Sequence, residues 1–310
     1  MKIEIDLDHY LAAHSASIYA IERASDTLFF TGGEDGNLLE WDLANPTQAR
    51  AIAKTQASIY VIKCIDRHLL FVGTNNGETY LINSSQKKVV SEQNFHRTVF
   101  DFSLQPDGRT ALIALADGYM ATVALPSLKI IRNVPIANGH IRTIQPHPNR
   151  TSFALGSSDG SIYFVSEQLK VQQVIEKAHN DSVFALHYVS AKNLISGGKD
   201  ALLKHWQTND GDFKEVTSVP AHMFAINQII AGPGTGQFTT ASRDKSIKIW
   251  DSQTLLLQKV IDRGKIARAS SHSVNRLVYL SSGVLAAVGD DRVVRVYSVR
   301  QKPPLNPMLN

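Results

Sequence analysis

The segment that decides the fold is Thr31-Gly32-Gly33-Glu34-Asp35-Gly36-Asn37-Leu38-Leu39-Glu40-Trp41. Six further segments of the 310-residue chain share its design, with Asp or Asn at the fifth position and Trp, Tyr, Val or Ile six residues later. The fifth positions are Asp35, Asn76, Asp117, Asp159, Asp200, Asp244 and Asp291. They are 41, 41, 42, 41, 44 and 47 residues apart, a register that chance does not keep over a whole chain. A period of this length predicts a repeat architecture.

Within each repeat the residues favour β-structure. Segments such as residues 28–31 and 293–297 are rich in β-branched and aromatic residues. Pairs such as Asp35-Gly36 and Asn76-Gly77 suit hairpin turns, because Gly takes positive φ at little cost. No segment has a helical period. Several short strands per period predict an all-β, seven-bladed β-propeller with four-stranded antiparallel blades.

The Trp positions carry a family resemblance. Trp41-Asp42 and Trp250-Asp251 end two repeats, Trp206-Gln207 ends a third, and a His lies 27 or 28 residues before each Trp. Over nearly the entire chain this pattern resembles the WD-repeat β-propeller family. The resemblance implies a buried His–Ser/Thr–Asp–Trp network in three blades, made of His14, Thr31, Asp35 and Trp41; His179, Ser196, Asp200 and Trp206; and His222, Thr240, Asp244 and Trp250.

The other four repeats depart from this pattern. Ile82, Val123, Val165 and Tyr297 replace the Trp, and Val72, Ile113, Leu155 and Ala287 replace the Ser or Thr. We expect these four blades to depend on apolar packing.

The ends of the chain predict how the ring closes. The last repeat reaches only its third strand before Pro303-Pro304, whereas residues 2–7 alternate like an unused strand. We expect that N-terminal strand to complete the last blade, so that residues 1–300 form a single domain and residues 301–310 a disordered tail.

Charge and composition narrow the class of protein. The net charge of +4 is uneven, since residues 1–50 hold three basic and nine acidic residues, whereas residues 259–302 hold nine basic and three acidic ones. A nucleic-acid surface on the basic last blade is an alternative that lacks interleaved aromatics. No apolar run is long enough for a membrane span or a signal peptide, and Cys64 is the sole cysteine. We therefore expect a cytoplasmic protein that has no contact with a membrane.

The residues that could carry chemistry favour a non-enzymatic protein. The Asp residues follow the repeat, as turn residues do, and no nucleophile elbow or phosphate-binding loop occurs. His187 and His205 lack carboxylates at ligand spacing, so we expect no metal and no cofactor. A propeller hydrolase or lyase at the channel mouth remains the alternative, with Glu34 and Asp290 as its candidate acids.

Two positions in each repeat predict a binding surface. The first position follows the β-branched residue that begins the inner strand, and the second precedes the turn Asp or Asn. By family geometry, both surround the mouth of the central channel. At these positions we predict the following partner-binding residues: Tyr19, Glu34, Tyr60, Phe100, Arg142, Phe184, Lys199, Asn227, Arg243, Asn275 and Asp290. Aromatic and Arg side chains dominate interface hot spots, so a protein or peptide segment, acidic or phosphorylated, is the expected partner. The alternative is that the aromatics only seal the channel. The sequence leaves the partner's identity and the oligomeric state open.

Overall fold

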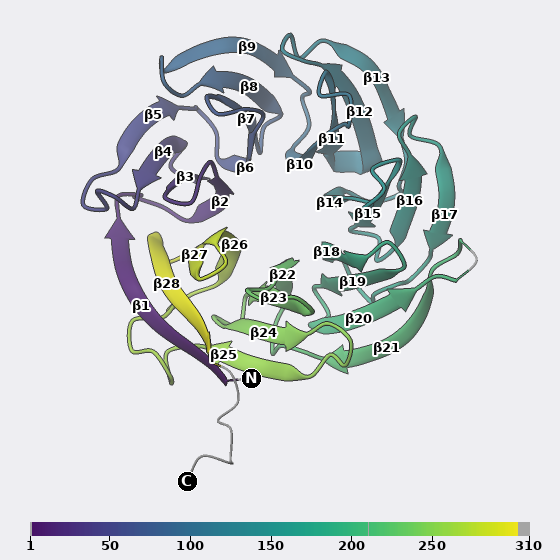
Figure 1. The fold of residues 1–310 in the computed structure, drawn as a ribbon. Coiled ribbons are helices and arrows are strands. Elements are labelled where there is room, and N and C mark those ends of the chain that lie inside the picture. The colour runs from purple at the N-terminus through teal and green to yellow at the C-terminus, as the bar shows by residue number, and fades with distance from the viewer. Residues whose placement is uncertain (1, 210, 303–310) are drawn as a thin grey trace.

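A computed structural model describes residues 2–209 and 211–302, which form seven four-stranded antiparallel sheets arranged as a ring (Figure 1). The first three sheets contain β2 (Ile18–Arg23), β3 (Leu28–Gly33), β4 (Asn37–Asp42) and β5 (Arg50–Lys54); β6 (Ile59–Cys64), β7 (Leu69–Thr74), β8 (Glu78–Asn83) and β9 (Lys88–Asn94); and β10 (Val99–Leu104), β11 (Thr110–Leu115), β12 (Tyr119–Ala124) and β13 (Ile130–Pro135). The next two contain β14 (Ile141–Pro146), β15 (Ser152–Ser157), β16 (Ile162–Ser166) and β17 (Val171–Ile175); and β18 (Val183–Ser190), β19 (Asn193–Gly198), β20 (Leu202–Gln207) and β21 (Lys214–Pro220). The last two contain β22 (Ile226–Ala231), β23 (Gln237–Ser242), β24 (Ile247–Asp251) and β25 (Leu257–Ile261); and β26 (Val274–Ser281), β27 (Val284–Gly289), β28 (Val293–Lys302) and β1 (Lys2–Ala12). The predicted seven-bladed propeller is confirmed.

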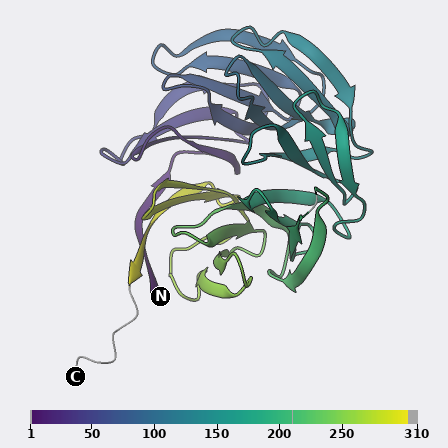
Figure 2. The same cartoon turned by 45° about the vertical axis from the view of Figure 1, so that its right-hand side comes forward.

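Each sheet runs from an inner strand at the channel to an outer strand at the rim, as Figures 1 and 2 show. The turn between the second and third strands contains the repeating Asp or Asn, and the residue after it has positive φ in all seven blades, from 65° at Ala201 to 96° at Gly77. A single-turn 3-10 helix, η1 (Ala116–Gly118), occupies this turn in the third blade. A Cβ on Gly36 would lie 2.4 Å from the Thr55 carbonyl oxygen, so that close-packed turn requires glycine.

The hydrophobic core is divided among the gaps between neighbouring sheets. One cluster, for example, joins Ile247 and Ile249 of β24 to Val274 and Leu277 of β26. The strands that carry these clusters are buried on both faces, as the pattern of β11 shows with five consecutive buried residues, Ala111–Leu115. Neighbouring sheets therefore stabilise one another, and the propeller depends on an unbroken ring.

The ring is closed by β1, which pairs antiparallel with β28 from Lys2↔Lys302 to Ala12↔Val293. This confirms the predicted closure, and β1 is longer than the expected residues 2–7. Ile3 is 5% exposed within the core of the last blade, and Asp6 forms an ion pair with Arg300 across the seam. Acidic and basic ends of the chain thus meet at the closure. Because β28 includes Gln301 and Lys302, the expected boundary at residue 300 falls inside a strand; the rest of the predicted tail, residues 303–310, lies outside the described residues.

None of the helical structure within residues 2–209 and 211–302 is long and apolar enough to cross a membrane.

Candidate functional site

Three blades contain the expected polar network between strands. In the first, the Trp41 indole N–H and the His14 Nε2 atom both lie 2.8 Å from Thr31 Oγ1, and His14 Nδ1 lies 3.1 Å from Asp35. The hydroxyl accepts from Trp41 and donates to Nε2, which leaves Nδ1–H to donate to the carboxylate. Burial lowers the pKa of His14 in spite of Asp35, and this favours the neutral ring that the hydrogen bonds require.

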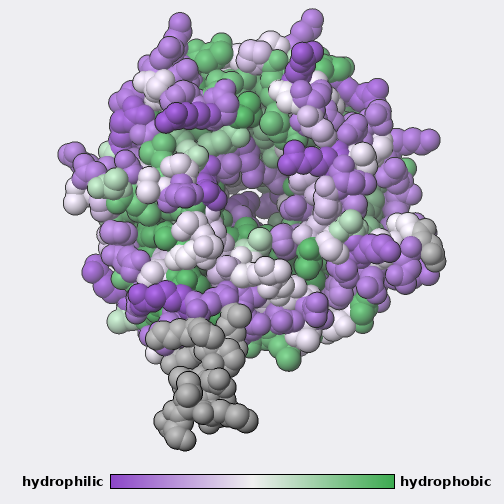
Figure 3. Space-filling model, viewed as in Figure 1, coloured by the Kyte–Doolittle hydropathy of each residue, from purple (hydrophilic) through white to green (hydrophobic). Residues whose placement is uncertain are grey.

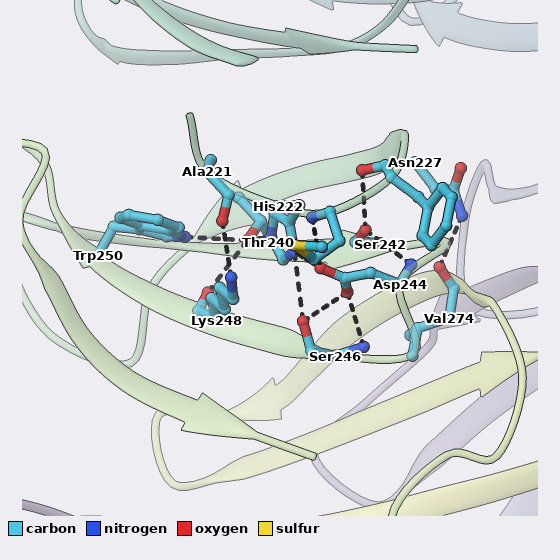
Figure 4. A network of polar contacts seen from close by, with 12 residues as sticks. Ala221, His222, Asn227, Thr240, Ser242, Asp244, Ser246, Lys248, Trp250 and Val274 are labelled. Carbon is cyan, nitrogen blue, oxygen red and sulfur yellow. Dashed lines mark hydrogen bonds and ion pairs between the residues drawn. The ribbon is translucent and has the colours of Figure 1, made fainter. Parts of the chain in front are cut away.

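The fifth and sixth blades repeat this geometry. The Ser196 hydroxyl lies 2.7 Å from both His179 Nε2 and Trp206 Nε1, and His179 Nδ1 lies 2.9 Å from Asp200. In the sixth blade, drawn in Figure 4, His222 lies 2.8 Å from Asp244 and 2.7 Å from Thr240, which also accepts from Trp250 at 2.9 Å.

In two of the remaining blades Val165 and Tyr297 pack in apolar clusters as expected, and a different polar contact, which was not expected, also holds the turn Asp. In the fourth blade Tyr163 donates its hydroxyl to Asp159 at 2.8 Å. In the seventh, the buried Arg295 forms an ion pair with Asp291 at 2.8 Å, and Ser270 donates to the same carboxylate at 3.0 Å. Tyr163 and Arg295 both lie four residues after the turn Asp, on the strand face that carries Trp elsewhere, so either side chain can reach back to it.

The channel mouth is built from one repeated irregularity of the inner strands. In every blade the register of the inner strand shifts after its first residue, between Ile18 and Ala20 in the first blade and between Val274 and Arg276 in the last. The skipped residue has no partner on the neighbouring strand, and such a bulge re-aims its side chain. The seven bulge residues are Tyr19, Tyr60, Phe100, Arg142, Phe184, Asn227 and Asn275.

These seven side chains line a single cavity of about 410 Å³ together with Thr98, His140 and Arg276. The ring is open at its centre, and hydrophilic side chains surround the opening in Figure 3. A second cavity of about 320 Å³ continues along the channel and shares Tyr60, Phe100 and Arg276 with the first. The mouth is therefore a hollow whose lining comes from all seven inner strands.

One side of this cavity is an aromatic arc. The ring centroids of Tyr19 and Tyr60 are 5.3 Å apart with an edge-on geometry, and those of Tyr60 and Phe100 are 6.2 Å apart. The guanidinium of Arg142 lies over Phe100, 4.0 Å from its centroid, and 5.1 Å from the centroid of Phe184. Cation–π contacts thus connect the arc to the next two blades.

The opposite side is polar and hydrogen-bonded between blades. Asn227 donates to Ser273 Oγ at 3.0 Å and to the Val274 carbonyl oxygen at 2.9 Å. Asn275 donates to the Ile18 carbonyl oxygen at 3.0 Å and to Asp290 at 2.7 Å. These two amides therefore join neighbouring blades, a role that their place in the sequence did not indicate.

Comparison with known proteins agrees with this geometry. The family model of the WD domain, G-beta repeat, matches residues 213–251, which contain the His222–Thr240–Asp244–Trp250 network. The chain is a WD-repeat propeller.

Solved and curated proteins show how far the likeness extends. The WD40 propeller domain of Doa1 is similar in fold, with a TM-score of 0.83 and 19% identity over 96% of this chain and 98% of that one. Nuclear distribution protein nudF 1 of Talaromyces marneffei is 30% identical over 37% of this chain and 26% of its own length. Cilia- and flagella-associated protein 52 of Macaca fascicularis is 20% identical over 83% of this chain and 45% of its own length. The matched part of this WD-repeat propeller thus spans between about a quarter and about half of these two relatives.

The four predicted residues that precede the turn Asp differ in their surroundings. Glu34 accepts a long hydrogen bond from the Tyr19 hydroxyl at 3.5 Å, and Asp290 accepts from Asn275. Lys199 is engaged by Asp181 at 3.0 Å, whereas Arg243 is exposed and forms no ion pair with any described residue. Three of the predicted residues are basic: Arg142, Lys199 and Arg243. Of these, Arg142 and Arg243 form no ion pair with a carboxylate in the described part of the chain.

Sequence reasoning missed an exposed apolar pair in the loop between β21 and β22, which leads into the inner strand that carries Asn227. Met223 and Phe224 are 82% and 60% exposed. They follow the network His222, where the other two His-containing blades have Ser15-Ala16 and Asn180-Asp181. Comparison of the loop residues at equal distance from the network His could have found them.

Part of the positive charge at the C-terminal end of the WD-repeat propeller is engaged within the fold. Arg276 faces the channel, Arg295 is buried against Asp291, and Arg300 is paired with Asp6. Three of the basic residues counted at this end are thus engaged inside the fold or at its seam.

Within the described residues, no three His, Cys, Asp or Glu side chains gather as a metal site requires. His205 Nε2 contacts Asn193 at 2.9 Å, and burial lowers the pKa of His187 to about 4.

Proposed function

We propose that this WD-repeat propeller is a non-enzymatic, cytoplasmic interaction scaffold that docks a protein or peptide segment on its channel-mouth face. WD-repeat propellers are typically protein-interaction scaffolds. The proposal adds to this the face that binds and the residues that make contact.

The observation that carries the proposal is that the mouth aromatics are not part of the core. Tyr19, Tyr60, Phe100 and Phe184 belong to none of the seven apolar clusters that fill the gaps between sheets. All four are half-buried and line the mouth cavity. Side chains that only sealed the channel would pack into those clusters. Accessible aromatics beside Arg are the typical anchors of a protein interface.

The chemistry of the surroundings indicates the kind of segment that would dock. Arg142 and Arg243 favour acidic groups, while Met223 and Phe224 offer apolar area outside the cavity. A segment with an acidic residue next to apolar ones would match both features.

The enzyme alternative finds less support at this mouth. Glu34 and Asp290 both accept hydrogen bonds from lining residues of their own blades, Tyr19 and Asn275. A pair of catalytic carboxylates would instead face a shared substrate position.

The test is a variant with Tyr60→Ala, Phe184→Ala and Arg243→Glu, used as bait for affinity capture from native lysate with mass spectrometry. We expect proteins captured by the wild type to be lost, because the anchors and one orienting charge are removed. The melting temperature should change little, since none of the three side chains lies in a core cluster or a polar network.

The matched control is Ile131→Ala, Val216→Ala and Lys214→Glu on the outer strands β13 and β21, where Ile131 and Val216 are 60% and 53% exposed. It makes a similar chemical change far from the channel and should retain the captured proteins. Loss of stability in the mouth variant with capture unchanged would show that the aromatics are structural and that the partner binds elsewhere.

A further inference from the structure

Two guanidinium groups share the mouth cavity without a carboxylate partner. Arg142 and Arg276 both line it, and neither forms an ion pair with a residue in the described part of the chain. The guanidinium of Arg142 lies over the faces of Phe100 and Phe184. Arg276 donates from one nitrogen to the carbonyl oxygens of Asn227 and Asn275, at 2.9 and 3.2 Å.

This arrangement is electrostatically unfavourable in the free protein. Burial, followed by the neighbouring Arg276, lowers the pKa of Arg142 to about 10, so the group stays charged near neutral pH but is destabilised. Burial also lowers the pKa of Arg276, and the nearby charge of Asp101 only partly opposes that shift. Like charges held together away from water raise the free energy of the site unless an anion joins them.

The nearest carboxylates in the channel are already engaged. Asp101 accepts hydrogen bonds from the backbone amides of Phe102 and Ile144, both at 2.9 Å, and Glu22 lies 3.9 Å from Lys63. Counting the two connected cavities, three cations (Lys63, Arg142 and Arg276) face two carboxylates. Among the residues that line the two cavities, one positive charge is therefore left uncompensated, and Glu34 and Asp290 lie outside this lining.

We propose that Arg142 and Arg276 form a carboxylate-binding site, and that the docked peptide segment inserts one Asp or Glu side chain between them. This inference rests on the proposed function and adds the chemistry of the inserted residue. A guanidinium presents paired N–H donors that match the two oxygens of a carboxylate. Phe100 and Phe184 hold the Arg142 plane, so little side-chain freedom is lost when the anion binds.

A single carboxylate fits the charge balance better than a phosphate group. It neutralises the one excess charge, whereas a phosphate dianion would exceed it. Glu34 and Asp290, outside the lining but bonded to Tyr19 and Asn275, repel any anion that enters, and they repel a dianion more strongly than a carboxylate.

The test is a selection of random dodecapeptides displayed on phage against the full chain, followed by synthesis of the enriched peptides. We expect enriched peptides to share one Asp or Glu next to apolar residues. Replacement of that residue by Asn or Gln should weaken binding by about 10- to 100-fold, the range for a hydrogen bond to a charged group. Arg142→Met and Arg276→Gln in the protein should cause a comparable loss.

A peptide with phosphoserine in place of the acid should bind more weakly than the carboxylate peptide; tighter binding would overturn the carboxylate assignment. Peptides that need Tyr60 and Phe184 but show no enriched acid would overturn this inference and leave the proposed function standing. If no selected peptide depends on Tyr60 and Phe184, the proposed function fails, and this inference fails with it.

The stability of Arg142→Met without ligand gives a second measurement. Met can keep apolar contact with Phe100 and Phe184 while it removes the repulsion with Arg276, so the melting temperature should stay the same or rise. A clear fall would assign Arg142 a structural role and contradict the proposal. Functional sites commonly trade stability for binding in this way.

Discussion

At the scale of single residues, one hydroxyl oxygen in each of three blades is contacted by two ring nitrogens, from a His and a Trp. Thr31, Ser196 and Thr240 are fully buried, so no water can replace a lost partner. The sequence was sufficient to predict these contacts through its resemblance to the WD-repeat family, which implies the network and the residues that form it. The contacts of Tyr163 and Arg295 were not predictable in the same way, since they depend on which strand face points back to the turn.

Thr240→Val tests the value of that hydroxyl, because it keeps the shape of the side chain and removes the donor and acceptor. Trp250 and His222 then each lose a buried partner, at about 1–3 kcal/mol per group. We expect a lower midpoint in urea unfolding. Thr217→Val is the control, since Thr217 is exposed on β21 and its replacement should change the free energy of unfolding by no more than about 0.5 kcal/mol. Equal effects of the two substitutions would show that the network does not contribute to stability.

The buried histidines make stability depend on pH. Burial lowers the pKa of His14 and His222, and that of His187 falls from 6.5 to about 4. The unfolded chain therefore binds protons first as the pH falls below 6.5, and stability drops until the folded pKa is reached. We expect a flat unfolding free energy above pH 7 and a decline between pH 6.5 and 4.

His187→Leu isolates one part of this decline. At about 1.4 kcal/mol per unit of pKa, His187 contributes at most about 3 kcal/mol of the loss, and the variant should lack that part. The loss below pH 4 should remain. Although burial opposes it, hydrogen bonds from backbone amides and the network His lower the pKa of Asp35, and His179 and His222 do the same for Asp200 and Asp244. A profile for His187→Leu that matches the wild type would contradict this assignment.

At the scale of strands, the inner strand and the closing strand determine the architecture. The β-bulge after the first residue of each inner strand turns seven side chains to one cavity. Sequence reasoning located these seven side chains through the family pattern, but it did not reveal the bulge, because a bulge leaves no mark on residue type. For the same reason it could not foresee that Asn227 and Asn275 bond across blades or that Arg276 lies beside Arg142.

Ile3→Asp tests the closing strand. Ile3 is 5% exposed in a core cluster, so the change removes about 2–5 kcal/mol of packing and buries a charge as well. We expect β1 to leave β28, with a broader and earlier melting transition and self-association through the freed strand edge, measured by light scattering. Ile131→Asp, in an outer strand where Ile131 is 60% exposed, should leave both properties unchanged. Normal melting of Ile3→Asp would refute closure by β1.

At the scale of the whole molecule, the repeat predicted seven blades because each period supplies one sheet that cannot bury both faces alone. What the repeat could not predict is where the blades differ. The aromatic arc lies on the first three blades, Phe184 lies on the fifth, and the guanidiniums of Arg142 and Arg276 lie on the fourth and seventh. We therefore propose that function in this propeller depends on the residues that depart from the repeat, which the ring places side by side at the channel mouth.

The pairing of β1 with β28 has a consequence during protein synthesis. A ribosome that adds about 5–20 residues per second needs about 15–60 s to pass from β1 to β28. For that time Ile3, Ile5 and Leu7 belong to a strand whose partner has not been made, and the blades already synthesised form an open arc. The nascent chain thus carries an exposed strand until the last blade emerges, and we expect this interval to be the one in which it is most prone to aggregation.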